Sequence, residues 1–292
     1  MALFDRLPPF LMAALGIALL TCMDAVIKQL SLSYGAFQIV FLRFMISALL
    51  MAALVARMGL SWPRPHRWRA YLFRAALTFI STACFFYALG RLPLAEVFAL
   101  SLTAPVFASL FAAVMLRERL GLVEALAILA GLAGMLVIVL GNAPADSPVR
   151  ETLALICALA APITYALTIV LLRQQTAHEP IPVIVAFQAF LVAGMSLPVA
   201  AFDFSRPLVA DWGLFLALGV LGSVGHLALT SGIKRLTTMR YSVVEYTGLL
   251  WAALLGYVVF REMPRPSIWP GAVLIIAGCL LVARVRTPKV AS

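Results

Sequence analysis

The chain has 292 residues, of which 64% are apolar and 12% are charged, and its formal net charge is +10. An ordinary soluble domain has about 25% charged residues, so this composition supplies too little polar surface for a soluble protein of this length. It therefore excludes a cytosolic enzyme, a nucleic-acid-binding protein and a disordered chain. It indicates a helical membrane protein that crosses the bilayer several times.

Long apolar segments follow one another along the chain, and a helix needs about 20 apolar residues to cross the hydrocarbon core. The first segment is too long for the apolar core of a cleaved signal peptide, and we interpret it as a retained span. We predict ten membrane-spanning helices, at residues 8–30, 36–56, 70–90, 94–116, 122–141, 152–172, 182–202, 213–232, 242–260 and 268–284. The loops between them are too short to hold a separate domain.

The basic residues lie mainly in alternate loops. With the N-terminus inside, 14 Lys and Arg fall in the predicted cytoplasmic segments, 5 in the outer segments and 3 within spans. The positive-inside rule then places both termini in the cytoplasm. The net positive charge follows from this topology and is not a sign of a nucleic-acid partner.

The second half of the chain repeats short sequences of the first half at a constant offset. Val114-Met-Leu-Arg-Glu118 returns as Val258-Val-Phe-Arg-Glu262, 144 residues later. We predict two repeats of five spans each, residues 1–145 and 146–292. Because five is odd, the second repeat enters the membrane from the opposite side. Inverted repeats around a site near the membrane midplane are typical of secondary transporters.

Charged side chains inside a membrane are costly to bury and usually face a bundle interior or a wet cavity. Asp24 and Lys28 are four residues apart and share one helix face. Asp24 lies about 9 Å below the outer end of the first span, and Arg43 lies about 10 Å below the same end of the second. With Gln38 above them, they form either a polar patch that binds substrate or a proton, or a permanent ion pair joining the two spans.

The other ionisable residues of the spans have competing interpretations. Glu96 opens the fourth span, where a carboxylate either favours the first helical turn or takes part in gating. Arg74 is expected to snorkel to the cytoplasmic surface. Glu245 shares a helical stripe with Tyr241, and the two belong either to a substrate- or proton-binding cavity wall or, for Glu245, to an ion pair with a neighbouring arginine. His226 either carries a proton or is a hydrogen-bonded packing residue.

Helix breakers and aromatic residues complete the predicted site. Pro105 and Pro162 each free a backbone carbonyl, which a membrane tolerates only beside protein or a cavity. Together with Gly222 they are candidates for gating, although close helix packing is the alternative for the glycine. Aromatic side chains are candidates to stack on a ring of the solute, or else packing residues and interfacial anchors. They are Tyr87, Tyr165, Tyr246 and Trp251.

Three stretches resemble the drug/metabolite transporter superfamily of the EamA type. They are Arg91-Leu-Pro-Leu-Ala-Glu96, Leu102-Thr-Ala-Pro-Val-Phe107 and Leu116-Arg-Glu-Arg-Leu120. The resemblance covers nearly the whole chain. It implies ten helices in two inverted repeats, residence in a bacterial inner membrane, a functional monomer and a small organic metabolite that passes through a central cavity.

Two further stretches resemble one branch of that superfamily. Met23-Asp24-Ala-Val-Ile-Lys28 and Tyr241-Ser-Val-Val-Glu245-Tyr246 are similar to the branch that includes bacterial riboflavin and S-adenosylmethionine transporters. The resemblance implies uptake of riboflavin or a similar ring-bearing vitamin or nucleotide-like solute. Export of an amino acid or a drug is the alternative.

Other functional classes fit the residues less well. Gly222-Ser-Val-Gly225 lacks the leading glycine of the GxSxG motif of hydrolases, and an HExxH motif is absent from the sequence. The loops have no filter character typical of a channel, and the sequence has no ATP-binding P-loop. We therefore predict a carrier driven by a solute or ion gradient. It is expected not to be an enzyme and to need no cofactor and no metal. A proton is the candidate coupling ion.

Overall fold

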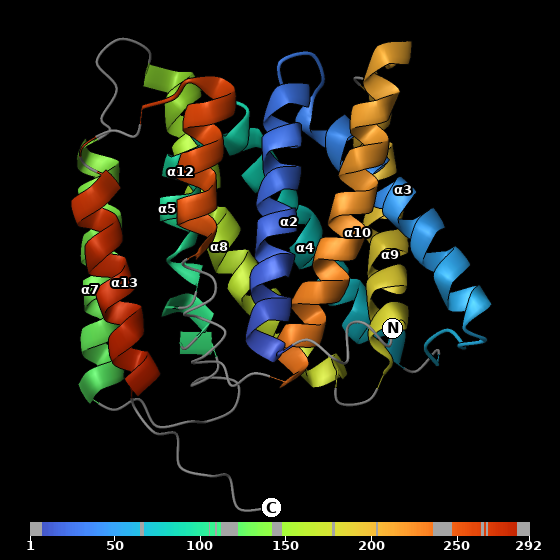
Figure 1. The fold of residues 1–292 in the computed structure, drawn as a ribbon, viewed down its shortest axis with the longest axis horizontal. Helices are drawn as coiled ribbons and strands as arrows, with labels where there is room; N and C mark the ends of the chain where they lie inside the picture. Colours follow the sequence, from blue (N-terminus) through green and yellow to red (C-terminus); the bar gives the residue numbers. More distant parts are fainter. Residues whose placement is uncertain are drawn as a thin grey trace, which may run out of the picture.

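The computed structural model describes residues 8–64, 67–104, 106–108, 110–111, 122–141, 148–176, 179–202, 204–235, 247–263, 266 and 268–284. Within this part of the chain every regular element is a helix, which confirms the predicted all-helical class (Figure 1). The principal helices are α2 (Pro9–Leu30), α3 (Ala36–Arg57), α4 (Trp68–Leu89), α5 (Leu94–Ser101), α7 (Leu122–Gly141), α8 (Pro148–Thr176), α9 (Ile181–Phe202), α10 (Trp212–Arg235), α12 (Thr247–Phe260) and α13 (Ile268–Arg284). A short 3₁₀ helix, η2 (Val209–Asp211), precedes α10.

Within the described residues, six segments are long and apolar enough to cross a membrane. They are Leu11–Leu30, Ala36–Arg57, Trp68–Leu89, Thr152–Thr176, Ile181–Phe202 and Val209–Arg235. Many of their large apolar side chains are exposed, among them Leu49, Phe190 and Leu216. Apolar outer faces of this kind suit contact with lipid. The count of ten crossings stays a prediction.

Two predicted spans differ from the structure by more than small shifts of their ends. The predicted fourth span, 94–116, begins as α5 but is interrupted after Ser101 by a turn at Leu102 and Thr103, and helix resumes at Ala104. A proline follows at position 105, and because proline has no N–H it cannot complete the hydrogen-bond ladder there. The predicted sixth span lies within α8, which is longer than predicted at both ends.

Proline and glycine set several helix ends. α2 begins at Pro9 in its first turn, where the missing N–H is not needed. After α3 the chain turns at Gly59, whose φ is +63°, a conformation that glycine adopts without strain. The N–H of Leu60 donates to the carbonyl of Val55, which closes the helix.

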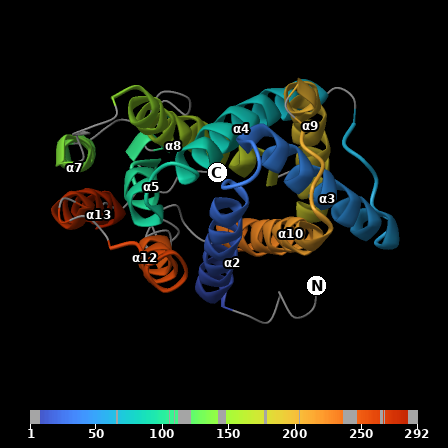
Figure 2. The same ribbon diagram turned by 90° about the horizontal axis from the view of Figure 1, so that it is seen from above.

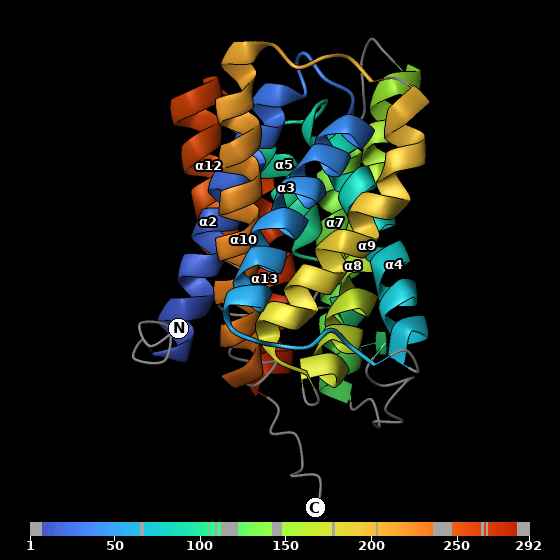
Figure 3. The same cartoon turned by 90° about the vertical axis from the view of Figure 1, so that its right-hand side faces the viewer.

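The main helix pairs join one half of the chain to the other. α2 packs against α10, α3 against α9, α4 against α8 and α7 against α13. Seen from above, α7 and α13 lie together at one edge, outside the remaining helices (Figure 2). The view with α3, α9 and α10 towards the reader shows the helices of both halves running roughly alongside one another (Figure 3).

Helices α2 and α10 approach each other closely enough to need glycine. A Cβ atom at Gly16 would lie 2.7 Å from the backbone nitrogen of Leu229 and 3.0 Å from the carbonyl oxygen of Gly225. A Cβ at Gly232 would lie 2.7 Å from the Cβ of Ala13. The backbones therefore touch, and this contact fixes the position of α2 against the second half.

Candidate functional site

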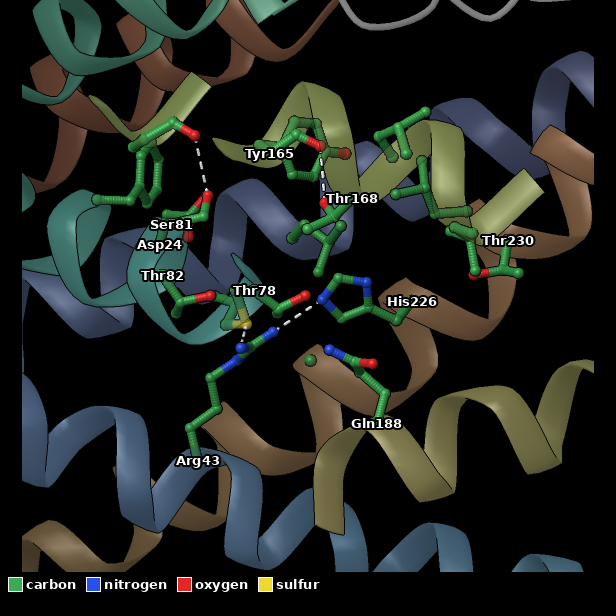
Figure 4. Close-up of a pocket in the computed structure, with 18 of the residues that line it drawn as sticks. Asp24, Arg43, Thr78, Ser81, Thr82, Tyr165, Thr168, Gln188, His226 and Thr230 are labelled. Carbon is green, nitrogen blue, oxygen red and sulfur yellow. Dashed lines mark hydrogen bonds between the residues drawn. The ribbon is translucent and has the colours of Figure 1, made fainter. Parts of the chain in front are cut away.

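A cavity of about 270 Å³ lies among the helices. Its lining comes from α2, α3, α4 and α5 of the first half and from α8, α9, α10 and α12 of the second. Solute-binding pockets in proteins have volumes of about 300–1,000 Å³, so the cavity is close to the size needed for a small organic molecule. Figure 4 shows the guanidinium of Arg43 directed at the ring of His226, with Thr78 and Gln188 beside them.

Arg43 is a buried cation in the wall of this cavity and is held by two other helices. Its Nη2 lies 2.8 Å from Nε2 of His226 on α10, and its Nε donates to the sulfur of Met23 on α2 at 3.2 Å. The guanidinium also lies over the ring of Phe44, 4.2 Å from the centroid. Because a guanidinium only donates hydrogen bonds, Nε2 of His226 accepts and the neutral imidazole carries its proton on Nδ1.

Gly222 makes room for this arrangement. A Cβ at position 222 would lie 3.1 Å from the sulfur of Met23 and 3.2 Å from Nε of Arg43. Gly222 was predicted from sequence as a gating residue, with close packing as the alternative. The structure places it against the Arg43 side chain and in the cavity lining.

Asp24 lies in the same cavity but forms no ion pair with Arg43. The Asp24 residue is 5% exposed, and within the described residues its carboxylate has neither a hydrogen bond nor a salt bridge. The permanent ion pair between the first two spans, one of the two alternatives that the sequence left open, is therefore absent from the described part of the structure. The carboxylate of Asp24 is instead buried and faces the cavity.

Arg74 is the second arginine of the cavity, and the expectation that it snorkels to the surface is wrong. It is 5% exposed and lines the cavity. Its guanidinium lies 5.9 Å from the ring of Tyr71, and its Nε and Nη2 atoms have no hydrogen-bond partner among the described residues. A long side chain near the end of a helix can point either to the membrane surface or into the helix bundle. Hydropathy alone does not distinguish these two orientations.

Hydroxyl and amide side chains supply most of the remaining polar lining, and sequence analysis did not identify them. They are Thr21, Ser47, Thr78, Ser81, Thr82, Ser101, Thr168, Gln188, Ser223 and Thr230. A signal was available on α4, because positions 74, 78, 81, 82 and 85 form a single helical stripe. Ser81 crosses from this stripe to α8 by donating to the carbonyl of Ala161 at 3.0 Å.

Several predicted site residues do line the cavity. Besides Asp24, Arg43 and Gly222, the lining includes Pro162, Tyr165 and His226. Four other predicted residues, Pro105, Tyr241, Glu245 and Tyr246, lie outside the described residues. Their roles stay sequence predictions.

Lys28 was predicted beside Asp24 in the site, but the structure places it in a different polar cluster. Its ammonium forms an ion pair with Glu262 at 2.9 Å and donates to the carbonyls of Leu92 at 2.6 Å and Leu89 at 3.3 Å. The other carboxylate oxygen of Glu262 accepts the N–H of Leu94 at the start of α5, at 3.0 Å. We call these residues the Lys28–Glu262 cluster.

Four more predicted residues are also absent from the cavity lining. Gln38 holds the loop before η2, because its amide donates to the carbonyl of Ser205 at 2.6 Å. Tyr87 stacks under the guanidinium of Arg91, 3.7 Å from the ring centroid. Glu96 is buried in the first turn of α5, and Trp251 is 42% exposed on α12.

Metal chemistry has no support in the described part of the chain. No group of three or more His, Cys, Asp or Glu side chains that could hold a metal ion occurs there. The described residues of the cavity thus offer charged, hydroxyl and aromatic contacts to a solute.

Comparison with known proteins identifies the family. The model of the EamA-like transporter family matches residues 7–140 and again residues 152–284. The chain belongs to the EamA-like transporter family. It is therefore a multi-pass membrane protein that transports a small molecule, and the predicted superfamily and the prediction that it is not an enzyme are confirmed.

Individual relatives of the EamA-like chain have different named solutes. It is 28% identical over 277 residues to the pseudopaline exporter of Pseudomonas aeruginosa, and the matched region covers 94% of this chain and 96% of the relative. It is 23% identical to the S-adenosylmethionine uptake transporter of Rickettsia bellii, covering 89% and 87%, and 26% identical to the riboflavin transporter of Brucella anthropi, covering 84% and 87%.

A solved structure shares the fold. One crystal structure superposes with a TM-score of 0.67 at 21% identity, covering 93% of this chain and 96% of that chain.

Proposed function

We propose that the protein is a gradient-driven secondary carrier that moves a small organic metabolite through the cavity between its two halves. The observation that carries the proposal is the buried Asp24 carboxylate, which faces a cavity lined from both halves and has no hydrogen bond or salt bridge among the described residues. An ionisable residue at membrane depth marks a solute or ion pathway more often than a structural contact.

The proposal includes two inverted five-helix repeats, residues 1–145 and 146–292, as the moving bodies. The helix pairs support this arrangement. A two-fold relation between the repeats would map α2 onto α8 and α4 onto α10, so the contact of α2 with α10 should be matched by a contact of α8 with α4, and both contacts are present. The ends of α5 and α12 support it too. Glu262, just after α12, accepts a hydrogen bond from the first residue of α5, so corresponding helices of the two halves meet end to start.

The solute that we propose first is a ring-bearing vitamin or nucleotide-like molecule, taken up across the inner membrane with both termini in the cytoplasm. The aromatic rings of Phe44, Phe86 and Tyr165 in the lining suit such a molecule. The similarity to uptake transporters named for S-adenosylmethionine and riboflavin supports the same class. The predicted residues Tyr241, Glu245 and Tyr246 remain part of the proposed solute site.

Export is the second candidate. The similarity to the pseudopaline exporter, over nearly the full length of both chains, favours it. A carrier whose halves rock around one site can run in either direction, and the gradient decides the net flux.

Counterflow in proteoliposomes tests the carrier. Vesicles are preloaded with unlabelled S-adenosylmethionine or riboflavin, and the labelled compound is added outside. A carrier gives a transient overshoot that saturates with concentration, whereas a pore does not. Growth of riboflavin-requiring cells on low riboflavin tests uptake, with the Asp24→Asn variant as control. The absence of exchange for every solute tried, or equal exchange by the variant, would contradict the proposal.

A further inference from the structure

Two cysteines meet between helices that belong to different halves of the chain. Cys84 lies on α4 and Cys157 lies on α8, and both are free thiols that are only partly buried. Their side chains are hydrogen-bonded to each other. Neither residue is part of the cavity lining, so the solute site described above does not account for the pair.

The packing of α4 against α8 explains why the two thiols face each other. Ser81 donates to the carbonyl of Ala161 at 3.0 Å, which fixes the register of the two helices. Cys84 follows Ser81 by three residues, and Cys157 precedes Ala161 by four residues. Each cysteine therefore lies one turn further along the same face of its helix, and the two form the next level of an antiparallel contact.

Small side chains bring the two backbones close together at this level. Ala154, Ala158 and Ala161 are all buried, and they form one stripe of α8 with Cys157. Ala161 of this stripe accepts the hydrogen bond from α4. A disulfide joins Cβ atoms that are about 4 Å apart, and a close approach of two helices along a face of alanines suits that distance.

The two cysteines also lie at the same depth within the apolar segments. Cys84 is five residues before the end of the segment Trp68–Leu89, and Cys157 is five residues after the start of the segment Thr152–Thr176. Either distance corresponds to about 8 Å along a helix. Because both thiols lie inside membrane-spanning segments, a reagent that reaches them has to be apolar.

We propose that Cys84 and Cys157 form a site of oxidative modification, at which an apolar organic disulfide, R–S–S–R, converts the two thiols into a disulfide that joins the two halves of the chain. One cysteine first attacks the oxidant and takes up an R–S group, while one R–SH leaves. The other cysteine then attacks the modified sulfur, expels the second R–SH and closes the bond. The cysteines lose two electrons and two protons, and both products R–SH carry them away.

The disulfide would tie together two walls of the cavity. α4 lines it with Thr78 and Ser81, and α8 lines it with Tyr165 and Thr168. In the proposed carrier one half moves against the other, so a covalent link between α4 and α8 stops the cycle. This consequence rests on the proposed function, whereas formation of the disulfide does not.

The thiol chemistry is tested with dithiodipyridine, an apolar disulfide that releases thiopyridone. The sequence has four cysteines, and the Cys22→Ser and Cys279→Ser substitutions leave only the pair. In lipid nanodiscs this full-length protein should release two thiopyridones and become lighter by two hydrogen atoms. With Cys84→Ser or Cys157→Ser added, it should release one thiopyridone and keep a thiopyridyl group on the remaining cysteine.

Counterflow in proteoliposomes tests the lock. The reduced protein with the pair should exchange solute, lose nearly all exchange after reaction with dithiodipyridine, and regain it after reduction with dithiothreitol. The single-serine variants should keep their exchange after the same reaction, because their halves are not joined. A protein without cysteines should be insensitive to the reagent, which controls for damage to the vesicles.

Four results would overturn the inference. Thiopyridyl groups that stay on both cysteines would mean that the thiols do not meet, and no reaction in nanodiscs would mean that an apolar disulfide cannot reach them. Undiminished exchange by the linked protein, or equal loss in the single-serine variants, would mean that the link is not a lock. Absence of exchange by the reduced protein contradicts the carrier proposal instead, and the mass measurement still decides whether the disulfide forms.

Discussion

Asp24 and Lys28 lie one helical turn apart on α2, yet their surroundings differ completely. Lys28 has a carboxylate and two backbone carbonyls around its ammonium, which matches its three N–H donors. Asp24 has no hydrogen bond or salt bridge to the described residues and faces the cavity. A satisfied charge fixes the structure, whereas a buried charge without a partner is available to a solute or a proton.

The same contrast separates two places where the halves of the chain meet. The Lys28–Glu262 cluster joins the end of α2, the start of α5 and the end of α12, and all its charges are compensated. The cavity is lined from both halves, and there Asp24 has no hydrogen bond or salt bridge among the described residues, while Nε and Nη2 of Arg74 have no hydrogen-bond partner. Substitutions in the cluster should therefore change stability, and substitutions in the cavity should change transport.

The largest effect is expected at Asp24. Asp24→Asn keeps the volume of the side chain but removes its charge, and we expect a loss of counterflow of roughly 100-fold. The melting temperature should stay near that of the wild type, because no described contact of the carboxylate is lost. A variant that exchanges solute at the wild-type rate would remove Asp24 from the site.

The next effect is expected at Gly16, because α2 carries both regions and this glycine sets its distance from α10. Gly16→Val would drive side-chain atoms into the backbone of Leu229, and we expect it to lower the free energy of unfolding by about 2–3 kcal/mol and to impair transport. The control is Gly194→Ala, since a Cβ there meets nothing within 4 Å. Equal stability of the two variants, measured by thermal unfolding, would mean that the close contact is unimportant.

A smaller effect on stability is expected at Lys28. Lys28→Met keeps the approximate length of the side chain but leaves the Glu262 carboxylate without its cation. This loss should lower the free energy of unfolding by about 1–2 kcal/mol. Solute affinity should not change, because Lys28 is not part of the cavity lining. Adding Glu262→Gln should recover part of the loss, and a double-mutant cycle measures that coupling. A large change in solute affinity would place Lys28 in the site after all.

The smallest effect is expected in the loops beside the Lys28–Glu262 cluster. The Tyr34 hydroxyl donates to Asp211 at 2.6 Å and accepts the N–H of Leu208 at 3.0 Å, and the bond to Asp211 raises the pKa of Tyr34. Because the folded-state pKa is raised, this stabilisation is present below the unfolded pKa of about 10 and is lost as the pH rises through the folded pKa.

Tyr34→Phe should therefore lower the melting temperature slightly at pH 7 and have no effect well above pH 10. The control is Tyr257→Phe, on a side chain that is 49% exposed. A difference between Tyr34→Phe and the wild type that grows with pH would contradict this account of the loop.

Sequence alone located the helices and part of the site. Apolar length is enough to place a membrane helix, but it did not reveal the interruption after Ser101 in the predicted span at 94–116. Asp24 and Arg43 were predicted at similar depth, since rise per residue fixes depth along a helix, and both line the cavity. Their supposed ion pair was wrong, because depth does not fix rotation, and α10 supplies His226 to Arg43 instead.

The partners of Lys28 and the inward turn of Arg74 could not be predicted from local sequence. Glu262 is far from Lys28 along the chain, and the two meet only because of how the halves pack. Arg74 lies within reach of both the surface and the interior, and only the neighbouring helices decide between them. The polar stripe that follows it on α4 was the available sign that this face points inward.

Solute counterflow in proteoliposomes, compared between Asp24→Asn and Lys28→Met, tests most directly the claim that the cavity is the transport site. The prediction is saturable exchange by the wild type and by Lys28→Met at a temperature where both are folded, with almost none by Asp24→Asn. Exchange by Asp24→Asn at the wild-type rate, with loss in Lys28→Met, would contradict it.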